Sequence, residues 1–344
     1  MCLQELRRKA KDTGIAMNGR IPTDKPLISI LMAVYEPRLD WLREQLASLE
    51  AQTYPYLRLY ILDDGSRTVG LDRIRACAAE NIRSFPFFVE GSGENRGSNA
   101  AFEALTRRAE GEYFAYCDQD DVWLPEKLEK LYETITAQQA QLVCSDMAVI
   151  DADGNRVAES ITALRRHHLF KSGEELWRTL WYSNFASGCA MLVRADAARS
   201  ALPFNPHMVY DHYIALCCSE RGRVVSVPEA LILHREHGGN QSSLLKGVED
   251  KQSYYRIRVE EKYRAVSWLC DNHAGPPELM DVLRRARKWM EARLRYARGE
   301  RRFAAEIWRQ REFSPRPALF ELAMPFMPEK LFDYVLSLAR NNRI

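Results

Sequence analysis

The sequence predicts an α/β fold in which a mostly parallel, Rossmann-like sheet with flanking helices is followed by a helical C-terminal extension. Short apolar, β-branched runs alternate with helical periodicity between residues 27 and 150, and this alternation is typical of crossover units in a parallel sheet. Beyond residue 250 the pattern is helical throughout. With 344 residues, the chain is long enough for one large α/β domain plus such an extension.

The elements of the alternating region can be justified in order. The run LISILMAVY (27–35) is continuous and apolar, as expected of a strand that is buried on both faces. Leucines spaced three or four residues apart follow it and predict a helix, and the same alternation continues along the chain. We expect strands at 27–35, 57–62, 85–90, 112–117 and 141–150, and helices at 39–49, 71–82, 98–109 and 125–139.

The pattern that follows is mixed. Residues 161–185 have helical spacing, with Trp177 and Trp181 four positions apart. The run SGCAMLVR (187–194) predicts a strand, and VVSVPEALILHR (224–235) predicts strands around a proline turn.

Charge and cysteine use indicate a protein of a reducing compartment with two differently charged parts. Residues 251–344 contain 20 Lys and Arg and 12 Asp and Glu, a charge of +8, so the rest of the chain carries −6 of the total of +2. The eight cysteines form no CxxC pair, which argues against a disulfide framework. Residues 1–26 form a polar leader without a signal-peptide core, and no run of about 18 apolar residues predicts a membrane span. We therefore expect a cytoplasmic protein.

Acidic residues follow the ends of two predicted strands. The fourth strand ends in CDQDD (117–121), and the second ends in DDGS (63–66). Because ligands bind beyond the carboxyl ends of parallel strands, these side chains should gather at one edge. A hard divalent cation, Mg²⁺ or Mn²⁺, would make the crowding favourable, and Asp118 and Asp120 would face it together because alternate side chains of an extended segment point the same way. The competing interpretation is that both segments are ordinary solvated turns.

The loop GSGENRGSNAAF (91–102) lies between a predicted strand and a predicted helix, as dinucleotide-binding loops do. Their glycine fingerprint requires a glycine at the position of Arg96, whereas Gly97 comes one residue late. This spacing argues against a dinucleotide-dependent oxidoreductase. We instead expect Asn95, Arg96 and the backbone at Gly97 to line a nucleotide or diphosphate pocket.

Five segments together resemble the inverting glycosyltransferases of family 2. They are LISILMAVYEP, ILDDGS, ENRGSNAAFEAL, YFAYCDQDDVWLPEKL and LILHREHGGNQS, and the resemblance covers roughly residues 27–245. Within the family they are most similar to bacterial rhamnosyltransferase-like enzymes of O-antigen and surface-polysaccharide assembly. The resemblance implies a GT-A fold with a nucleotide-binding half (about 27–150) and an acceptor half (about 151–245), followed by a basic helical C-terminal region (246–344).

The resemblance also implies roles for single residues. Asp64, the second Asp of DDGS, would contact the nucleobase, and Tyr35 would line the same pocket. Asp118 would contact the ribose and, with Asp120, hold the divalent cation.

The general base implied by the resemblance is Asp211. The family usually has an acidic residue here, often within His-Asp-Trp, whereas this sequence has Tyr210-Asp211-His212. The competing interpretation is that Asp211 caps the N-terminus of a helix.

The segment LILHREHGGNQSS (231–243) matches a family segment, with His234 and Gly239 as departures. The resemblance implies that His237 completes the metal shell or contacts the diphosphate, and that Arg235 pairs with phosphate oxygens. The competing interpretation is that His237 is a loop residue.

The reaction implied is one displacement at the anomeric carbon of a nucleotide sugar, with dTDP-L-rhamnose as donor and a hydroxyl of a growing surface glycan or lipid-linked oligosaccharide as acceptor. A UDP-hexose or UDP-N-acetylhexosamine is the alternative donor, because thymine and uracil present the same N–H edge. An alternative of another class is a partner subunit that binds nucleotide sugars without catalysis.

The basic C-terminal region has two interpretations. In the first, an apolar stripe packs on the catalytic domain; its residues are Val282, Trp289, Tyr296 and Phe303. In the second, segment 318–339 attaches to an anionic membrane surface at the inner face of the cytoplasmic membrane. No motif supports nucleic-acid binding, so we expect no nucleic-acid partner.

Overall fold

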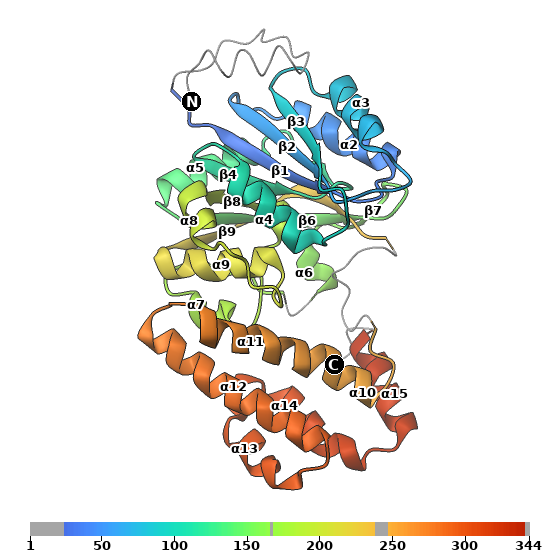
Figure 1. Ribbon diagram of the computed structural model, residues 1–344, viewed down its shortest axis with the longest axis vertical. Coiled ribbons are helices and arrows are strands. Elements are labelled where there is room, and N and C mark those ends of the chain that lie inside the picture. The colour runs from blue at the N-terminus through green and yellow to red at the C-terminus, as the bar shows by residue number, and fades with distance from the viewer. Residues whose placement is uncertain (1–23, 166–167, 238–246, 341–344) are drawn as a thin grey trace.

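The computed structural model describes residues 24–165, 168–237 and 247–340 of the chain. In this part of the chain, a nine-stranded sheet has the strand order β3-β2-β1-β4-β8-β6-β9-β5, and β7 pairs with β6. Helices lie on both sides of the sheet (Figure 1). The strands are β1 (Ile28–Val34), β2 (Leu57–Asp63), β3 (Phe87–Gly91), β4 (Tyr113–Cys117), β5 (Val122–Trp123), β6 (Leu142–Ile150), β7 (Arg156–Ala158), β8 (Met191–Arg194) and β9 (Val224–Arg235). The helices up to residue 221 are α2 (Leu39–Glu50), α3 (Leu71–Asn81), α4 (Ser98–Arg108), α5 (Lys127–Ala137), α6 (Ile161–Leu164), α7 (Trp177–Leu180), α8 (Ala195–Ser200) and α9 (Tyr210–Arg221).

Strands β1 to β4 pair in parallel, as the alternation of strands and helices predicts. Their registers align Val34 with Asp63, Asp63 with Gly91, and Met32 with Cys117. The carboxyl ends of these four strands therefore lie at one edge of the sheet, where the predicted site loops begin. The later strands make the whole sheet mixed, because β8 is antiparallel to β4 and β6 whereas β9 is parallel to β6.

Each face of the sheet has its own apolar core, which is why the strands read as continuous apolar runs. Ile28, Ile30 and Met32 of β1 pack in one core with α2, α3 and α5. Leu31, which points to the other face, packs in the second core with α4, α8 and α9. This three-layer arrangement confirms the predicted α/β class.

Two predictions for the second half are wrong in detail. Residues 161–185 are not one helix. The described residues of this range contain the short helices α6 and α7, and Gly173 between them pairs with Val224 through two backbone hydrogen bonds of 2.9 Å. The proline turn expected within 224–235 is a bulge in the single strand β9. Successive ladder partners there are Val227 and Ala230, so Pro228, which has no N–H to donate, is left outside the ladder.

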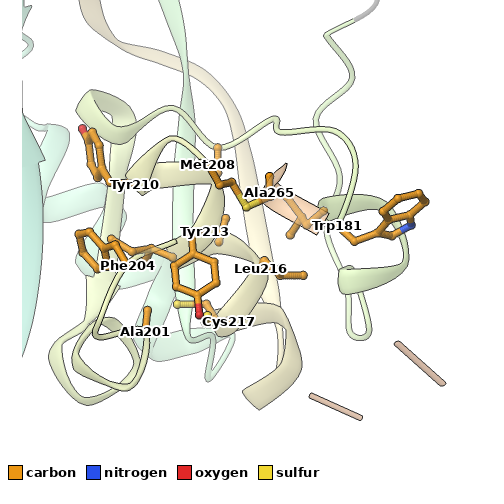
Figure 2. Packing of buried hydrophobic residues seen from close by; sticks show 14 of the residues in the cluster. Trp181, Ala201, Phe204, Met208, Tyr210, Tyr213, Leu216, Cys217 and Ala265 are labelled. Atoms are coloured by element: carbon orange, nitrogen blue, oxygen red, sulfur yellow. The ribbon is translucent and has the colours of Figure 1, made fainter. Parts of the chain in front are cut away.

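The helical extension packs on the α/β part of the chain, where α11 lies next to α7 and α9 (Figure 1). It consists of α10 (Lys251–Tyr255), a π-helical turn (Arg256–Glu260), α11 (Glu261–Asn272), α12 (Pro277–Ala297), α13 (Ala304–Arg309), α14 (Pro315–Ala323) and α15 (Glu329–Arg340), with short 3₁₀ turns between some of them. Figure 2 shows Tyr213, Leu216 and Cys217 of α9 near Ala265 of α11. Trp289 of α12 is 0 % exposed and belongs to the same core. Tyr296 is buried in this core as well, and Val282 and Phe303 pack against it, so the apolar stripe is packed rather than exposed. Its partners are mainly α11 and α13 of the extension itself. Among the described residues, none of the helices has the length and apolar character that crossing a bilayer requires.

Candidate active site

Asp64 joins the loop after β2 to the loop after β3. Its carboxylate accepts hydrogen bonds from the backbone N–H groups of Arg96 (3.0 Å) and Gly97 (2.8 Å). Gly65 has a φ of +76°, and a Cβ there would lie 2.5 Å from the backbone carbonyl carbon of Glu94, so the close approach of the two loops requires glycine. Asp64 is only 4 % exposed. Asp64 therefore fixes the 91–97 loop through these two hydrogen bonds.

Tyr35 lies at the end of β1, where Gln119 connects it to the acidic segment after β4. The backbone N–H of Tyr35 donates to Oε1 of Gln119 (2.9 Å), and Nε2 of Gln119 donates to the carbonyl oxygen of Tyr35 (3.1 Å). The Tyr35 side chain is 46 % exposed. The next residue, Glu36, has a φ of +43° and accepts hydrogen bonds from the N–H groups of Arg67 and Thr68. These bonds lower the pKa of Glu36 and fix the β1 end against the β2 loop.

Asn95 and Arg96 lie exposed on the loop after β3. Oδ1 of Asn95 accepts a hydrogen bond from the N–H of Gly97 (3.1 Å). The guanidinium of Arg96 contacts the carboxylate of Glu94 through Nε (3.0 Å) and Nη2 (2.9 Å). Because exposed ion pairs contribute little stability, Arg96 can exchange Glu94 for another anion at small cost.

Asp118 lies among like charges. Burial, followed by the negative charges of Asp121 and Asp120, raises the pKa of Asp118 to about 8. The charge of Asp211 acts in the same direction, so Asp211 lies in the same neighbourhood although it is 93 positions away in the sequence. Within the described residues, no donor forms a hydrogen bond with the Asp118 carboxylate.

Asp120 and His237 lie next to each other, as they must if both are to hold one metal ion. Nε2 of His237 lies 2.8 Å from Oδ2 of Asp120. Burial raises the pKa of Asp120, whereas the hydrogen bond and charge of His237 lower it. Both residues line a cavity of about 220 Å³, together with Glu36, Arg38, Trp41 and Gln119. The rest of the predicted segment, residues 238–243, lies outside the described residues.

Asp121 forms a buried pair with His234, which the sequence analysis noted only as a departure from the family. Nδ1 of His234 lies 3.0 Å from Oδ1 of Asp121, and the same oxygen accepts the N–H of Arg235 (3.0 Å). Burial opposes a charge on either group, but their attraction holds the pKa of Asp121 below its usual value and raises that of His234 to about 9. A protonated His234 thus neutralises Asp121.

In the described part of the chain, Asp121, Cys189 and His234 form a group whose potential ligand atoms lie within 4.8 Å of one another. All three side chains are buried, and Oδ2 of Asp121 has no hydrogen-bond partner. A thiolate, an imidazole and a carboxylate suit Zn²⁺ better than Mg²⁺. The buried ammonium of Lys127 lies close enough to interact with Asp121 and Cys189, and it would repel a cation. The set Asp118, Asp120 and His237 therefore fits a hard cation better.

Arg235 is 1 % exposed and lies behind the acidic segment. Its Nε donates to the carbonyl oxygen of Asp120 (2.9 Å), and Nη1 donates to the carbonyl oxygens of Asp151 and Ala152 (both 3.4 Å). Its Nη2 contacts the carboxylate of Glu44 in α2. The guanidinium thus connects the backbone of the acidic segment to α2 and to the turn after β6.

Asp211 lies in the first turn of α9. The N-cap position is Val209, so the capping interpretation is wrong. The carboxylate accepts hydrogen bonds from Nδ2 of Asn184 (3.1 Å) and from the N–H of Gly188 (2.9 Å). Burial nevertheless raises the pKa of Asp211 to about 6.

Contacts between α4 and the start of α9 determine where Asp211 lies. Oδ1 of Asn99 accepts the N–H of Tyr210 (2.9 Å), and the Tyr210 ring stacks on Phe102 with centroids 4.0 Å apart. A Cβ on Gly188 would lie 2.0 Å from the Tyr210 hydroxyl oxygen. Because α4 follows the 91–97 loop, this loop and Asp211 are both held by α4.

Sequence reasoning missed the residues that position the predicted ones. Gln119, Asn184 and Gly188 make their contacts across distant segments, so no local pattern marks them. His234 had a signal, since it lies next to Arg235 in a segment already singled out, but its partner Asp121 could not be assigned from the sequence.

Comparisons with known proteins agree with this arrangement. The family model described as Glycosyl transferase family 2 matches residues 29–199. TuaG of Bacillus subtilis, whose name assigns it to teichuronic acid biosynthesis, is 28 % identical over 139 residues, which is 40 % of this chain and 54 % of TuaG. The chain spans between 54 % and 66 % of the length of the curated relatives that it matches first.

Two solved structures have a similar fold. The mannosyltransferase PcManGT from Pyrobaculum calidifontis, in complex with GDP-Man and Mn²⁺, has a TM-score of 0.55 at 15 % identity and covers 99 % of this chain and 90 % of its own. TarS 1–349 from S. aureus, in complex with UDP-GlcNAc, has a TM-score of 0.51 at 16 % identity and covers 79 % of this chain and 87 % of its own. These likenesses support the GT-A fold. The family match over residues 29–199, together with the curated glycosyltransferase relatives, shows that the chain belongs to glycosyltransferase family 2.

Proposed function

We propose that this chain is a metal-assisted, inverting glycosyltransferase that moves a sugar from a nucleotide-sugar donor to a hydroxyl group. The observation that carries the proposal is the common neighbourhood of Asp118, Asp120 and Asp211, where burial raises the pKa of each carboxyl. Partly buried carboxylates that repel one another are unfavourable alone, and a cation with a bound diphosphate would offset their repulsion.

The residues fit a divalent cation. The Asp118 carboxylate accepts no hydrogen bond from the described residues, and Asp120 lies 2.8 Å from the imidazole of His237. Carboxylate oxygens with substrate phosphates suit Mg²⁺, and an added imidazole also suits Mn²⁺. We propose that Asp120, Asp118 and His237 hold this ion. When bound, it supplies Lewis-acid stabilisation of the charge that develops on the leaving diphosphate.

Asp211 is proposed to act as the general base. It would take the proton of the acceptor hydroxyl while that oxygen attacks the anomeric carbon, and a pKa of about 6 suits a base that works near neutral pH. The hydrogen bonds from Asn184 and Gly188 would keep its carboxylate oriented during this step. One displacement without an enzyme nucleophile inverts the anomeric configuration.

The remaining predicted residues would bind the donor. Tyr35, which is exposed at the end of β1, would line the nucleobase pocket. Asp64 was expected to contact the nucleobase itself, but its buried carboxylate accepts the N–H groups of Arg96 and Gly97, so we propose that it shapes the pocket through the loop it holds. Asn95 lies on that loop, and Arg96 would exchange Glu94 for the diphosphate. Arg235 was expected to pair with phosphate oxygens, but its side chain is buried against protein carbonyl groups. We propose instead that it supports the site by holding the Asp120 backbone.

The donor and acceptor follow from the resemblance rather than from the geometry. We propose dTDP-L-rhamnose as donor and a surface glycan or lipid-linked oligosaccharide as acceptor. A UDP-N-acetylhexosamine is the second candidate, favoured by the fold likeness to TarS, which is described in complex with UDP-GlcNAc. In either case residues 27–150 would bind the donor and residues 151–245 the acceptor.

A thermal-shift panel tests the proposal. The protein would be heated with dTDP-rhamnose, UDP-GlcNAc, UDP-glucose, GDP-mannose or NAD, each with Mn²⁺ or with EDTA. We expect one nucleotide sugar to raise the Tm only in the presence of Mn²⁺, because a bound ligand stabilises the folded state. Stabilisation by NAD alone, or by no nucleotide sugar, would contradict the proposal.

We further propose that the C-terminal helices contact an anionic membrane surface that carries the acceptor. Phe326 is 76 % exposed, Tyr334 60 % and Leu331 47 %, within a region of net positive charge. Segment 318–339 itself holds one lysine and three acidic residues, but Arg301 lies over the Phe326 ring, 5.3 Å from its centroid, and supplies a basic neighbour. Exposed aromatic and apolar groups with such neighbours suit an interfacial position.

Flotation with phosphatidylglycerol vesicles tests this contact. The double variant Phe326→Ser with Tyr334→Ser should lose flotation, whereas Leu169→Ser, which removes an exposed apolar group (65 %) from another part of the surface, should keep it. Equal flotation of both variants would overturn the membrane proposal and leave the enzyme proposal intact.

A further inference from the structure

Lys127 is a charged residue in a place that disfavours its charge. It is the first residue of α5 and is 0 % exposed. A positive charge at a helix N-terminus opposes the helix dipole, and a buried ammonium is costly unless it is paired. Burial accordingly lowers the pKa of Lys127 to about 7. An apolar side chain would avoid both penalties, so the contacts of the ammonium must account for its presence.

The ammonium contacts two segments of the site. Nζ lies 3.1 Å from the ring centroid of Trp123, two positions after the acidic segment. It also donates a hydrogen bond to the carbonyl oxygen of Cys189, in the 3₁₀ turn Gly188–Ala190. Both contacts are within the buried interior, where charge-assisted and cation–π interactions are strongest.

The turn that Lys127 contacts is the one that orients Asp211. The N–H of Gly188 donates to Oδ2 of Asp211 at 2.9 Å, and the carbonyl of the next residue, Cys189, accepts from Lys127. The turn has little room to adjust, because a Cβ on Gly188 would lie 2.0 Å from the Tyr210 hydroxyl oxygen.

We propose that Lys127 is a positioning residue that connects the acidic segment to Asp211, by holding the turn at 188–190 whose N–H orients the Asp211 carboxylate. The inference rests on the proposed role of Asp211 as the base. Lys127 itself does not touch the substrate. Its removal should affect the rate of the chemical step more than donor binding, since small displacements of a catalytic group reduce rate strongly.

The test compares two lysines of one helix. Lys127→Met keeps the length of the side chain but removes its charge and donor. Lys130→Met, one turn later, removes the same charge from a half-exposed side chain that pairs with Glu126 and Glu229. The assay measures nucleoside diphosphate release from the donor selected by the thermal-shift panel, with water as the accepting hydroxyl, and calorimetry measures donor binding.

We expect Lys127→Met to lower kcat by about tenfold or more, with the donor Kd within about twofold of the native value. Its Tm should be unchanged or raised, because apolar replacement of a buried charge is often neutral or stabilising. Lys130→Met should match the native protein in all three measurements.

Two results would overturn the inference. One is a Lys127→Met variant that turns over like the native protein. The other is a variant that loses donor binding or cooperative unfolding together with turnover, because Lys127 would then serve the fold alone. A native protein that releases no nucleoside diphosphate from any donor would instead contradict the proposed function.

Discussion

Asp211 carries its charge where burial opposes it. Its carboxylate accepts hydrogen bonds from Asn184 and Gly188, yet burial raises its pKa to about 6. A carboxylate that is held in place and is easily protonated has the properties of a general base.

Replacing Asp211 by Asn tests this role at the level of one residue. Asp211→Asn should lower transfer by about a hundredfold or more, because positioned general bases contribute that much to rate. Donor binding, measured by calorimetry, should remain, since Asp211 would contact the acceptor. Loss of donor affinity in the variant would assign the residue to the donor site instead.

The pH dependence of the rate tests the same group without a mutation. Because the base must be deprotonated, kcat/KM should be level above neutral pH and fall tenfold per pH unit below about pH 6. The sign for stability is opposite. A pKa raised by folding means that the protonated group favours the folded state, so this contribution is present in acid and is lost as the pH rises through about 6. A rate that stays level down to about pH 4, the usual range for aspartate, would contradict the assignment.

Among single residues, the sequence could indicate which carry charge at the strand ends but not which neighbours tune them. Asp118, Asp120 and Asp64 follow apolar runs, and that is a local pattern. The neutralisation of Asp121 by His234, 113 positions later, depends on the pairing of β5 with β9. Only the folded chain brings these two residues together.

Among the elements, the 3₁₀ turn Gly188–Ala190 connects α5 to the start of α9. The N–H of Gly188 orients Asp211, and the carbonyl of Cys189 accepts from Lys127. Tyr210 of α9 fills the space beside Gly188. The position of the turn therefore depends on α5 and α9 together.

Gly188→Ala should disturb this turn. The new Cβ would lie 2.0 Å from the Tyr210 hydroxyl oxygen, and overpacking of this kind costs about 1–3 kcal/mol. We expect a lower midpoint in urea unfolding and a reduced kcat. Gly70→Ala, where a Cβ meets nothing within 4 Å, is the control. Because Gly70 is the N-cap of α3 and alanine is a poorer N-cap, it should cost no more than about 1 kcal/mol and should leave kcat unchanged. Equal effects of the two substitutions would contradict the packing described for the turn.

The success of element prediction depended on how local the signal was. Strands β1 and β4 are buried on both faces, so their apolar runs are unambiguous. The edge strand β3 has no buried residue, yet its run of aromatic and β-branched side chains still marked it. The spacing of Trp177 and Trp181 reflects one short helix, and the expected long helix fails because Gly173 pairs with Val224 of β9. That pairing is a tertiary contact with no local signal.

At the scale of the whole molecule, the helical extension completes the core beneath α9. Arg293 of α12 and Glu321 of α14 form an ion pair in its interior, with side-chain exposures of 1 % and 0 %. The composition predicted a basic helical region, but it could not predict which arginine is buried, because most of the others face water.

Glu321→Gln tests how the extension is held together. It would leave the Arg293 charge buried without its partner, and this typically costs about 3–5 kcal/mol. Glu312→Gln breaks the exposed pair with Arg285, at 3.0 Å, and should cost about 0–1 kcal/mol. Urea unfolding of both variants checks the difference. Similar losses of unfolding free energy in the two variants would contradict the burial of the Arg293–Glu321 pair.

The measurement that tests the central claim most directly is a calorimetric titration of the selected donor into the native protein and into Asp120→Ala, each with Mn²⁺ and with EDTA. The account predicts that the native protein binds donor at least about tenfold more tightly with Mn²⁺, a difference of about 1.4 kcal/mol, and that Asp120→Ala binds equally weakly in both buffers. Native binding that is the same with Mn²⁺ and with EDTA would contradict it.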